Sequence, residues 1–230
     1  MEKFYFEVPT IERKKDAIEY INEHYEYKSN INGTGGLHRY LDNYEGWLEK
    51  LEKDYTMVPN EERVPARTFF LVRENDNRIV GMINIRTALN ERLRKGGGHI
   101  GYGIRPSERG KGYNKVNLYL GLKVCKEYGI DKVLMDATLD NPASWKTMEA
   151  LGGIRVKEWI DEEDNSLTVN YEIDVKNAIE KNKDLYEPYV GDNKTIKSKR
   201  WKVPPTRTFF VLCVPPINQK RTMYQDIVLK

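Results

Sequence analysis

The amino-acid sequence predicts a fold of the α/β or α+β class, in which helices flank a mixed β-sheet. Apolar residues recur at helical spacing in some segments and in short β-branched or alternating runs in others, and the two kinds of segment alternate along the chain. Residues 99–136 read as strand, helix and strand, which is the pattern of a crossover connection within one sheet.

The first part of the chain predicts one strand and two helices. The opening residues form an apolar strand that ends at Pro9, and Thr10 is a suitable N-cap for the helix that follows. A glycine-rich loop at residues 32–36 leads to a second helix over residues 37–51, whose aromatic and leucine side chains recur at helical spacing. Residues 55–66 are polar and contain two prolines, so we expect a loop there.

The rest of the chain predicts a hairpin and then alternating elements. The β-branched and aromatic run at residues 68–72 and the apolar run at residues 79–85 flank a turn at residues 75–77, which indicates a β-hairpin. Further elements are a strand over 99–104, a helix over 112–128 that ends at Gly129, a strand over 131–138, a helix over 141–151, and a strand pair over 154–160 and 167–173.

Composition excludes several classes of protein. The 230 residues include 38 Lys and Arg and 35 Asp and Glu, and 39% are hydrophobic, which is typical of a folded globular chain and not of a disordered one. No apolar run approaches the roughly 20 residues that a membrane-spanning helix needs. The N-terminus lacks the apolar core of a signal peptide, and the two cysteines, Cys125 and Cys213, are too few for a disulfide scaffold or a thiolate zinc site. We therefore expect a cytoplasmic protein without a structural metal.

The C-terminal residues differ from the rest. Residues 191–230 carry nine Lys and Arg against two acidic residues. We expect one domain over residues 1–175 and a basic C-terminal extension over residues 176–230. The extension repeats the four residues 67–70 as residues 207–210. The alternatives are a chance repeat and a strand that pairs with the sheet or with a second subunit in a homodimer. Binding of nucleic acid by the extension is a less favoured alternative, because basic tails are usually only solvated. The aromatic residues available for stacking on bases are Trp201, Phe209 and Phe210.

The most informative segment is residues 101–114, which begins as a strand, passes through a bend rich in glycine and basic residues, and ends as a helix. Glycines allow the backbone to approach a ligand closely and to turn its N–H groups toward it. The N-terminus of a helix adds a partial positive charge, so a pyrophosphate is a suitable ligand. An ordinary solvated loop is the alternative interpretation. The segment contains neither G-x-x-x-x-G-K-[ST] nor G-x-G-x-x-G.

Two motifs resemble those of one enzyme superfamily. The sequence RGKGYN at residues 109–114, preceded by Ile104-Arg105-Pro106, resembles the acetyl-CoA motif R/Q-x-x-G-x-G/A of the GNAT N-acetyltransferases. The sequence NPASWKTMEALGG at residues 141–153 resembles the next motif of that superfamily, in which an asparagine opens a helix that ends at glycine. The similarity extends over residues 8–174, and it is closest to predicted GNAT enzymes of Gram-positive bacteria.

This resemblance implies a fold and a reaction. The fold is a twisted, mostly antiparallel sheet, flanked by helices, whose two central parallel strands splay apart. The function is transfer of an acetyl group from acetyl-CoA, as cosubstrate, to a primary amine of a small molecule, peptide or protein. The resemblance assigns cofactor binding to Gly103, Ile104, Arg105, Arg109, Gly110, Lys111, Gly112, Tyr113, Asn114, Asn141 and Ser144.

The chain departs from the superfamily pattern at two positions. Asn114 stands where glycine or alanine is usual, and Met148 stands where many members place the tyrosine that protonates the departing thiolate. The missing tyrosine supports an alternative function, a non-catalytic acyl-CoA-binding or sensory module.

An amine must lose a proton before it attacks a thioester, because a lysine-like amine has a pKa of about 10.4. The sequence offers three candidate bases: His99 on the cofactor strand, Glu108 just past it, and Asp136 on the facing strand, with water as a further possibility. His99 is the first candidate, against the alternative that it is a structural histidine. The glycine-rich loop at residues 32–36 and the helix at residues 37–51 are expected to overhang the acceptor site.

Overall fold

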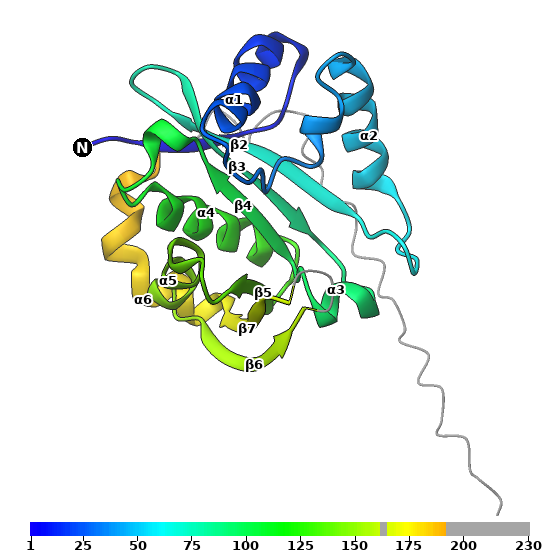
Figure 1. Ribbon diagram of the computed structural model, residues 1–230. Coiled ribbons are helices and arrows are strands. Elements are labelled where there is room, and N and C mark those ends of the chain that lie inside the picture. The colour runs from blue at the N-terminus through cyan, green and yellow to red at the C-terminus, as the bar shows by residue number, and fades with distance from the viewer. Residues whose placement is uncertain (162–164, 192–230) are drawn as a thin grey trace, which may run out of the picture.

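The structure is a computed structural model that describes residues 1–161 and 165–191. Its strands form two antiparallel sheets, one in the order β1–β2–β3–β4 and one in the order β5–β7–β6 (Figure 1). The first sheet consists of β1 (Phe4–Glu7), β2 (Ala66–Arg73), β3 (Arg78–Arg86) and β4 (Ile100–Ile104). The second sheet consists of β5 (Lys132–Thr138), β6 (Ile154–Ile160) and β7 (Leu167–Asp174).

Helices cover both faces of the first sheet. Figure 1 shows α1 (Lys14–Glu26) and α2 (Tyr44–Thr56) on one side of the sheet and α4 (Tyr113–Glu127) on the other. Two further helices, α5 (Pro142–Ala150) and α6 (Val175–Tyr186), pack against α4. Neighbouring residues of β2 accordingly belong to different hydrophobic clusters: Phe69 packs with the α4 side and Phe70 with the α1–α2 side. Burial on both faces explains why residues 69–72 of this strand form an unbroken apolar run.

The predicted mixture of strands and helices is confirmed, and so are the hairpin of β2 and β3 and the helix that ends before Gly129. The prediction for the second helix was wrong at its start. Residues Leu37–Arg39 form a short 3₁₀ turn, and α2 begins only at Tyr44, where the side chain of Asn43 accepts a hydrogen bond from the N–H of Gly46. Thr10 makes no side-chain cap, and it precedes a 3₁₀ turn, Ile11–Arg13, through which the chain enters α1.

Two helices were not predicted. Helix α3 (Glu91–Lys95) is short and begins at Asn90, whose side chain accepts a hydrogen bond from the N–H of Leu93. Helix α6 begins at the expected domain boundary, residue 175, and buries Val175, Ala178 and Tyr186 in the same cluster as α4. The packed core therefore continues past residue 175.

The chain after α6 returns to the first strand, where the N–H of Gly191 donates to the carbonyl of Phe4 (2.8 Å). The features expected in residues 192–230, including the aromatic residues and the strand repeat, lie outside the described residues, as do most residues of the turn expected between β6 and β7. No helix within residues 1–161 and 165–191 is long and apolar enough to cross a membrane.

Candidate functional site

Strands β4 and β5 meet at one point and otherwise belong to different sheets. The N–H of His99, directly before β4, donates to the carbonyl of Leu134 on β5 (2.7 Å). The N–H of Leu134 donates in turn to Nδ1 of the His99 side chain (2.9 Å). Past this contact, the described residues of β4 and β5 share no ladder. The strands therefore separate toward their C-terminal ends, as the resemblance implied.

The edge of β4 that faces this gap has free backbone groups. The N–H of Arg86 donates to the carbonyl of His99 (2.7 Å), and the N–H of Arg105 donates to the carbonyl of Val80 (2.9 Å). Because hydrogen-bonded positions alternate in an antiparallel ladder, the odd-numbered residues of this segment pair with β3. Tyr102 and Ile104 consequently direct their N–H and C=O groups away from β3. Of the residues expected to contact the cofactor arm here, Ile104 is at this edge, whereas Gly103 and Arg105 pair with β3.

The bend after β4 contains two glycines in a backbone conformation that other residues rarely adopt. Gly110 and Gly112 have φ values of +77° and +83°, in the left-handed region, and a Cβ atom on either would meet nothing within 4 Å. Gly112 is the N-cap of α4 and supplies no side-chain cap. The first N–H groups of a helix have no partner within the helix, so those of Tyr113 and Asn114 can bind an anion. Asn114 lies in this first turn and has no positive φ.

The basic side chains of the bend have protein partners. Nε of Arg109 donates to the carbonyl of Ile104 (3.0 Å), and its Nη2 donates to Oγ of Ser29 (2.7 Å). Nζ of Lys111 donates to Oε2 of Glu108 (2.8 Å). Both residues are exposed, so their charges also face solvent at the mouth of the bend.

Glu108 lies beneath this bend and is almost fully buried, with 3% of its surface exposed. Its carboxylate accepts hydrogen bonds from Arg73 (2.8 Å) and Arg78 (3.1 Å), in addition to Lys111. Burial alone would raise the pKa of Glu108, but the hydrogen bonds from Lys111 and Arg73 outweigh it and hold the pKa below its ordinary value. A carboxylate stabilised in its ionised form by three cations is a poor proton acceptor. The geometry therefore indicates that Glu108 stabilises the structure by joining Arg73, Arg78 and Lys111, and that it does not act as a base.

A second carboxylate, Glu23 of α1, holds the start of the bend. It accepts hydrogen bonds from the N–H of Ser107 (2.8 Å) and from Nη1 of the buried Arg105 (2.9 Å). Nε of Arg105 donates to the carbonyl of Ile79 (2.9 Å). The Arg105 side chain thus joins β3 and α1 and is not available to a ligand.

The glycine-rich loop at residues 32–36 lies directly on β4. A Cβ atom on Gly33 would come within 2.6 Å of Cα of Tyr102, and one on Gly103 would come within 2.9 Å of the carbonyl oxygen of Asn32. Backbone therefore packs on backbone at this face of the strand, and only glycine permits that approach. The loop therefore lies directly against β4, and its expected place over the acceptor site stays a prediction.

Helix α5 faces the gap from the side of β5. Its N-cap, Asn141, accepts a hydrogen bond from the N–H of Ser144 (3.3 Å). The hydroxyl of Tyr102 reaches across from β4 and lies 3.1 Å from the carbonyl oxygen and 3.2 Å from Oγ of Ser144. Met148, one turn further along α5, is buried. Burial raises the pKa of Tyr102, which keeps its phenol protonated at neutral pH.

His99 has little capacity to act as a base in this structure. A neutral imidazole has one nitrogen lone pair, and here Nδ1 uses it to accept the N–H of Leu134. Burial is the main cause that lowers the pKa of His99 to about 4, and Arg94 and Arg86 lower it further. Proton uptake would break the bond to Leu134.

Asp136 lies on β5 and is half-buried. Its Oδ2 accepts a hydrogen bond from the N–H of Gly97 (2.7 Å). No bond to Oδ1 is found within the part of the chain that the structure describes. The electrostatic influence of Asp136 reaches the phenol of Tyr102 and the guanidinium of Arg86. Asp136 is therefore near the gap with one carboxylate oxygen available.

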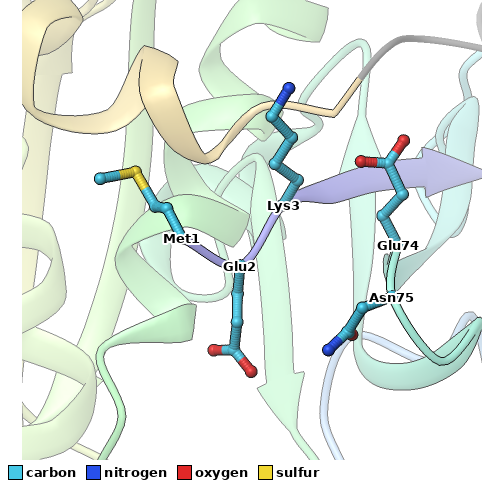
Figure 2. Close-up of a pocket in the computed structure, with 5 residues that line it drawn as sticks. All are labelled: Met1, Glu2, Lys3, Glu74 and Asn75. Carbon is cyan, nitrogen blue, oxygen red and sulfur yellow. The ribbon is translucent and has the colours of Figure 1, made fainter.

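A surface pocket of about 310 Å³ lies at the N-terminus, and one of its lining residues, Glu2, accepts a hydrogen bond from the hydroxyl of Tyr113. Met1, Glu2 and Lys3 line it opposite Glu74 and Asn75, and Figure 2 shows Glu2 and Lys3 pointing in opposite directions. None of the residues expected at the site lines this pocket.

The sequence analysis named the residues of the bend but missed those that support it. Tyr102, Glu23 and Leu134 act through hydrogen bonds between segments far apart in the chain, and no local pattern marks such pairs. Tyr102 had one usable signal, its alternation with Gly101 and Gly103, which places its side chain on the face of α5.

Comparisons with known proteins agree with this geometry. The model of a family described as the acetyltransferase (GNAT) family matches residues 34–152, just over half of the chain. No curated protein matches the sequence significantly. The similar solved structures include a chimera of the spermidine N-acetyltransferase SpeG of Vibrio cholerae and hSSAT, which is 14% identical, has a TM-score of 0.56, and covers 77% of this chain and 98% of its own.

Two further solved structures show the same likeness. The dodecameric spermidine N-acetyltransferase of Vibrio cholerae is 13% identical, with a TM-score of 0.54 and coverage of 78% of this chain and 98% of its own. A GNAT-family acetyltransferase of Bacillus anthracis is 16% identical, with a TM-score of 0.50 and coverage of 76% and 99%. At these identities the likeness concerns the fold.

Proposed function

The chain belongs to the GNAT acetyltransferase family, and from that premise we propose that it is an N-acetyltransferase that moves the acetyl group of acetyl-CoA to a primary amine. The observation that carries the proposal is the continuity of the open edge of β4 with the bend at residues 109–114. An extended arm can pair with the edge while a diphosphate at its end meets the N-terminus of α4.

We assign the cofactor contacts accordingly. The N–H groups of residues 110–114 face the pyrophosphate, and Arg109 and Lys111 add positive charge at its side. The arm pairs with the backbone of Tyr102 and with the N–H of Ile104, because the carbonyl of Ile104 already accepts a hydrogen bond from Arg109. Asn141 and Ser144 lie along the opposite wall, on the first turn of α5.

Of the three candidate bases, Asp136 fits the chemistry best, because His99 and Glu108 are committed to other contacts. In the proposed reaction a neutral amine attacks the thioester carbon, forming the C–N bond and a tetrahedral oxyanion. A backbone N–H of the open edge of β4 stabilises this oxyanion. Asp136, directly or through water, takes the proton that converts the incoming ammonium to the neutral amine and releases it to solvent. After the attack it takes the second proton that the nitrogen loses and releases it in the same way, and the C–S bond then breaks.

The departing thiolate needs a proton, and Met148 cannot supply one. The phenol of Tyr102 is the hydroxyl that the structure places between β4 and α5, bonded to Ser144 one turn before Met148. We assign proton donation to this phenol, which regains its proton from solvent through Oγ of Ser144. The overall balance is one amide and one free thiol formed for each amine and thioester consumed.

The acceptor is proposed only as a primary amine. Two of the solved structures named above are of spermidine N-acetyltransferases, but at 13% and 14% identity their substrate does not carry over to this chain. A half-buried carboxylate, Asp136, beside the gap favours a cationic amine as the incoming group.

A non-catalytic acyl-CoA-binding module is the competing function, and Met148 is the observation in its favour. Isothermal titration with acetyl-CoA, followed by a thiol-release assay on a panel of polyamines, aminoglycosides and peptides, separates the two. We expect binding in the micromolar range and release of CoA with at least one class of amine. Binding without release from any amine would support the module, and absence of binding would refute both functions.

A further inference from the structure

His99 and Leu134 form a closed pair of hydrogen bonds at the point where β4 and β5 part. The backbone N–H of His99 donates to the carbonyl of Leu134 (2.7 Å), and the N–H of Leu134 donates to the imidazole Nδ1 of His99 (2.9 Å). One residue of β5 thus has both backbone groups satisfied by one residue that precedes β4, through a main-chain group and a side chain.

This arrangement ends the ladder. In a continuous sheet, the N–H of Leu134 would be accepted by a backbone carbonyl of the neighbouring strand, and the next pair would follow. Here a side-chain nitrogen takes that N–H, so β4 gains no register with β5 beyond Leu134. The backbone groups of Tyr102 and the N–H of Ile104 consequently have no partner on β5, whereas the carbonyl of Ile104 accepts a hydrogen bond from Nε of Arg109 (3.0 Å).

The approach of the two segments is fixed by neighbouring residues. Gly98 has a φ of +50°, and a Cβ atom there would lie 2.1 Å from the carbonyl oxygen of Leu134, so only glycine permits the contact. Nη1 of Arg86 donates to the carbonyls of Gly97 (2.7 Å) and Gly98 (2.8 Å), which holds the turn against β3. The conformation of residues 97 and 98 therefore places the imidazole of His99 next to the N–H of Leu134.

We propose that His99 is a positioning residue, whose imidazole opens the slot between β4 and β5 by capping the N–H of Leu134. The use of that slot for the arm of acetyl-CoA rests on the function proposed above, whereas the capping itself does not. His99 acts through Leu134 and the strand edge, and it does not take part in proton transfer.

The protonation state of the imidazole fits this role. Nδ1 accepts a hydrogen bond only in the neutral Nε2–H form. The charged groups around His99 are Arg86 on β3 and Arg94 on α3, which both disfavour a second positive charge. On β5, Asp136 is bound to the N–H of Gly97.

Two substitutions test the proposal. In His99→Asn, the amide oxygen is placed to accept the N–H of Leu134, but the side chain cannot act as a base near neutral pH. In His99→Ala, the acceptor is lost. The measurements are the Kd of acetyl-CoA by titration, kcat with a working amine, and hydrogen exchange of the Leu134 amide, with circular dichroism as the control for folding.

We expect His99→Ala to weaken acetyl-CoA binding by about 10-fold, the equivalent of about 1.4 kcal/mol, and to speed exchange of the Leu134 amide. We expect His99→Asn to keep the Kd of acetyl-CoA and the exchange rate of the Leu134 amide close to their wild-type values, and to retain kcat. Tight binding by the alanine variant together with a slow-exchanging Leu134 amide would overturn the proposal.

A different result would show that His99 is the general base. If His99→Asn binds acetyl-CoA normally and protects Leu134 but loses kcat by about 100-fold or more, proton transfer and not positioning is its role. If the wild-type protein does not bind acetyl-CoA, the proposed function fails, and exchange at Leu134 in the two variants still decides whether His99 caps that amide. If the alanine variant does not fold, the asparagine variant alone gives the exchange rate of the Leu134 amide and kcat.

Discussion

Nζ of Lys111 lies 2.8 Å from Oε2 of Glu108, so a cation of the proposed phosphate site is tied to a buried carboxylate directly beneath it. Because Arg73 and Arg78 contact the same carboxylate, its removal leaves three cations without their common partner. We expect Glu108→Gln to lower the free energy of unfolding by about 3 kcal/mol, the cost typical of breaking a buried ion pair. Urea denaturation at pH 7 measures it.

The effect of Glu108→Gln should depend on pH. The pKa of Glu108 is held below its ordinary value, so the ionised carboxylate stabilises the fold above the unfolded-state pKa of about 4.3. That contribution is lost as the pH falls through the lower pKa of the folded state. The stability difference between wild type and variant should therefore shrink on acidification. A difference that is constant down to pH 3 would contradict this assignment, and Glu45→Gln, which removes an exposed pair with Lys14, should change stability little at any pH.

Gly112→Val should weaken acetyl-CoA binding by about 100-fold or more, the equivalent of about 2.7 kcal/mol. The added side chain would project where the pyrophosphate is proposed to lie, and a β-branched residue at a φ of +83° would also distort the bend. Isothermal titration gives the Kd.

Gly129→Val is the matched control for Gly112→Val. Gly129 also has a positive φ, +69°, with open space around it, but it lies at the other end of α4. Both variants carry a similar backbone strain, so comparable melting temperatures are expected, and only Gly112→Val should lose affinity. Equal affinities in the two variants would rule out the proposed phosphate site.

The sequence predicted most elements of this fold because their signals are local. Hydrophobic spacing, the turn at residues 75–77 and the glycine after α4 each act within one segment. The start of α2 was placed seven residues early because Leu37, in a 3₁₀ turn, and Tyr44 and Trp47, in the helix, all pack into one cluster. A buried 3₁₀ turn imitates helical spacing over so short a distance.

The candidate site shows the same difference between features that a local sequence pattern marks and features that depend on long-range contacts. The bend at residues 109–114 was identified because glycine and charge pattern lie together in the chain. The sequence could not predict whether the candidate bases are already hydrogen-bonded, because their partners are distant in the chain. These partners are Leu134 for His99, and Arg73 and Arg78 for Glu108. Whether a titratable side chain can accept a proton depends on the hydrogen bonds and ion pairs that it makes in the folded structure.

Asp136→Asn should reduce kcat/KM by about 100-fold, the lower range for loss of a general base, with little change in the Kd of acetyl-CoA. The asparagine oxygen can still accept the N–H of Gly97, so the local structure is retained. Asp136→Ala removes that contact as well and should also lose stability. Steady-state kinetics on the best amine, measured against pH, would contradict the assignment if Asp136→Asn kept wild-type turnover.

Tyr102→Phe should lower kcat by about 100-fold without weakening acetyl-CoA binding, because it deletes the proposed proton donor and keeps the buried ring. Tyr119→Phe is the control, since it removes another buried tyrosine hydroxyl, the one that donates to Glu187 (2.8 Å) on the far side of α4. That change should cost about 1 kcal/mol of stability and leave kcat as it is.

A selenoester analogue of acetyl-CoA distinguishes a proton donor from a packing residue at position 102. A selenol is a stronger acid than a thiol, so its anion leaves with less need for protonation. If the phenol of Tyr102 donates the proton, the deficit of Tyr102→Phe should largely vanish with the selenoester. If the hydroxyl instead orients α5 through Ser144, the deficit should be the same with both donors, because the misplaced helix would affect them equally.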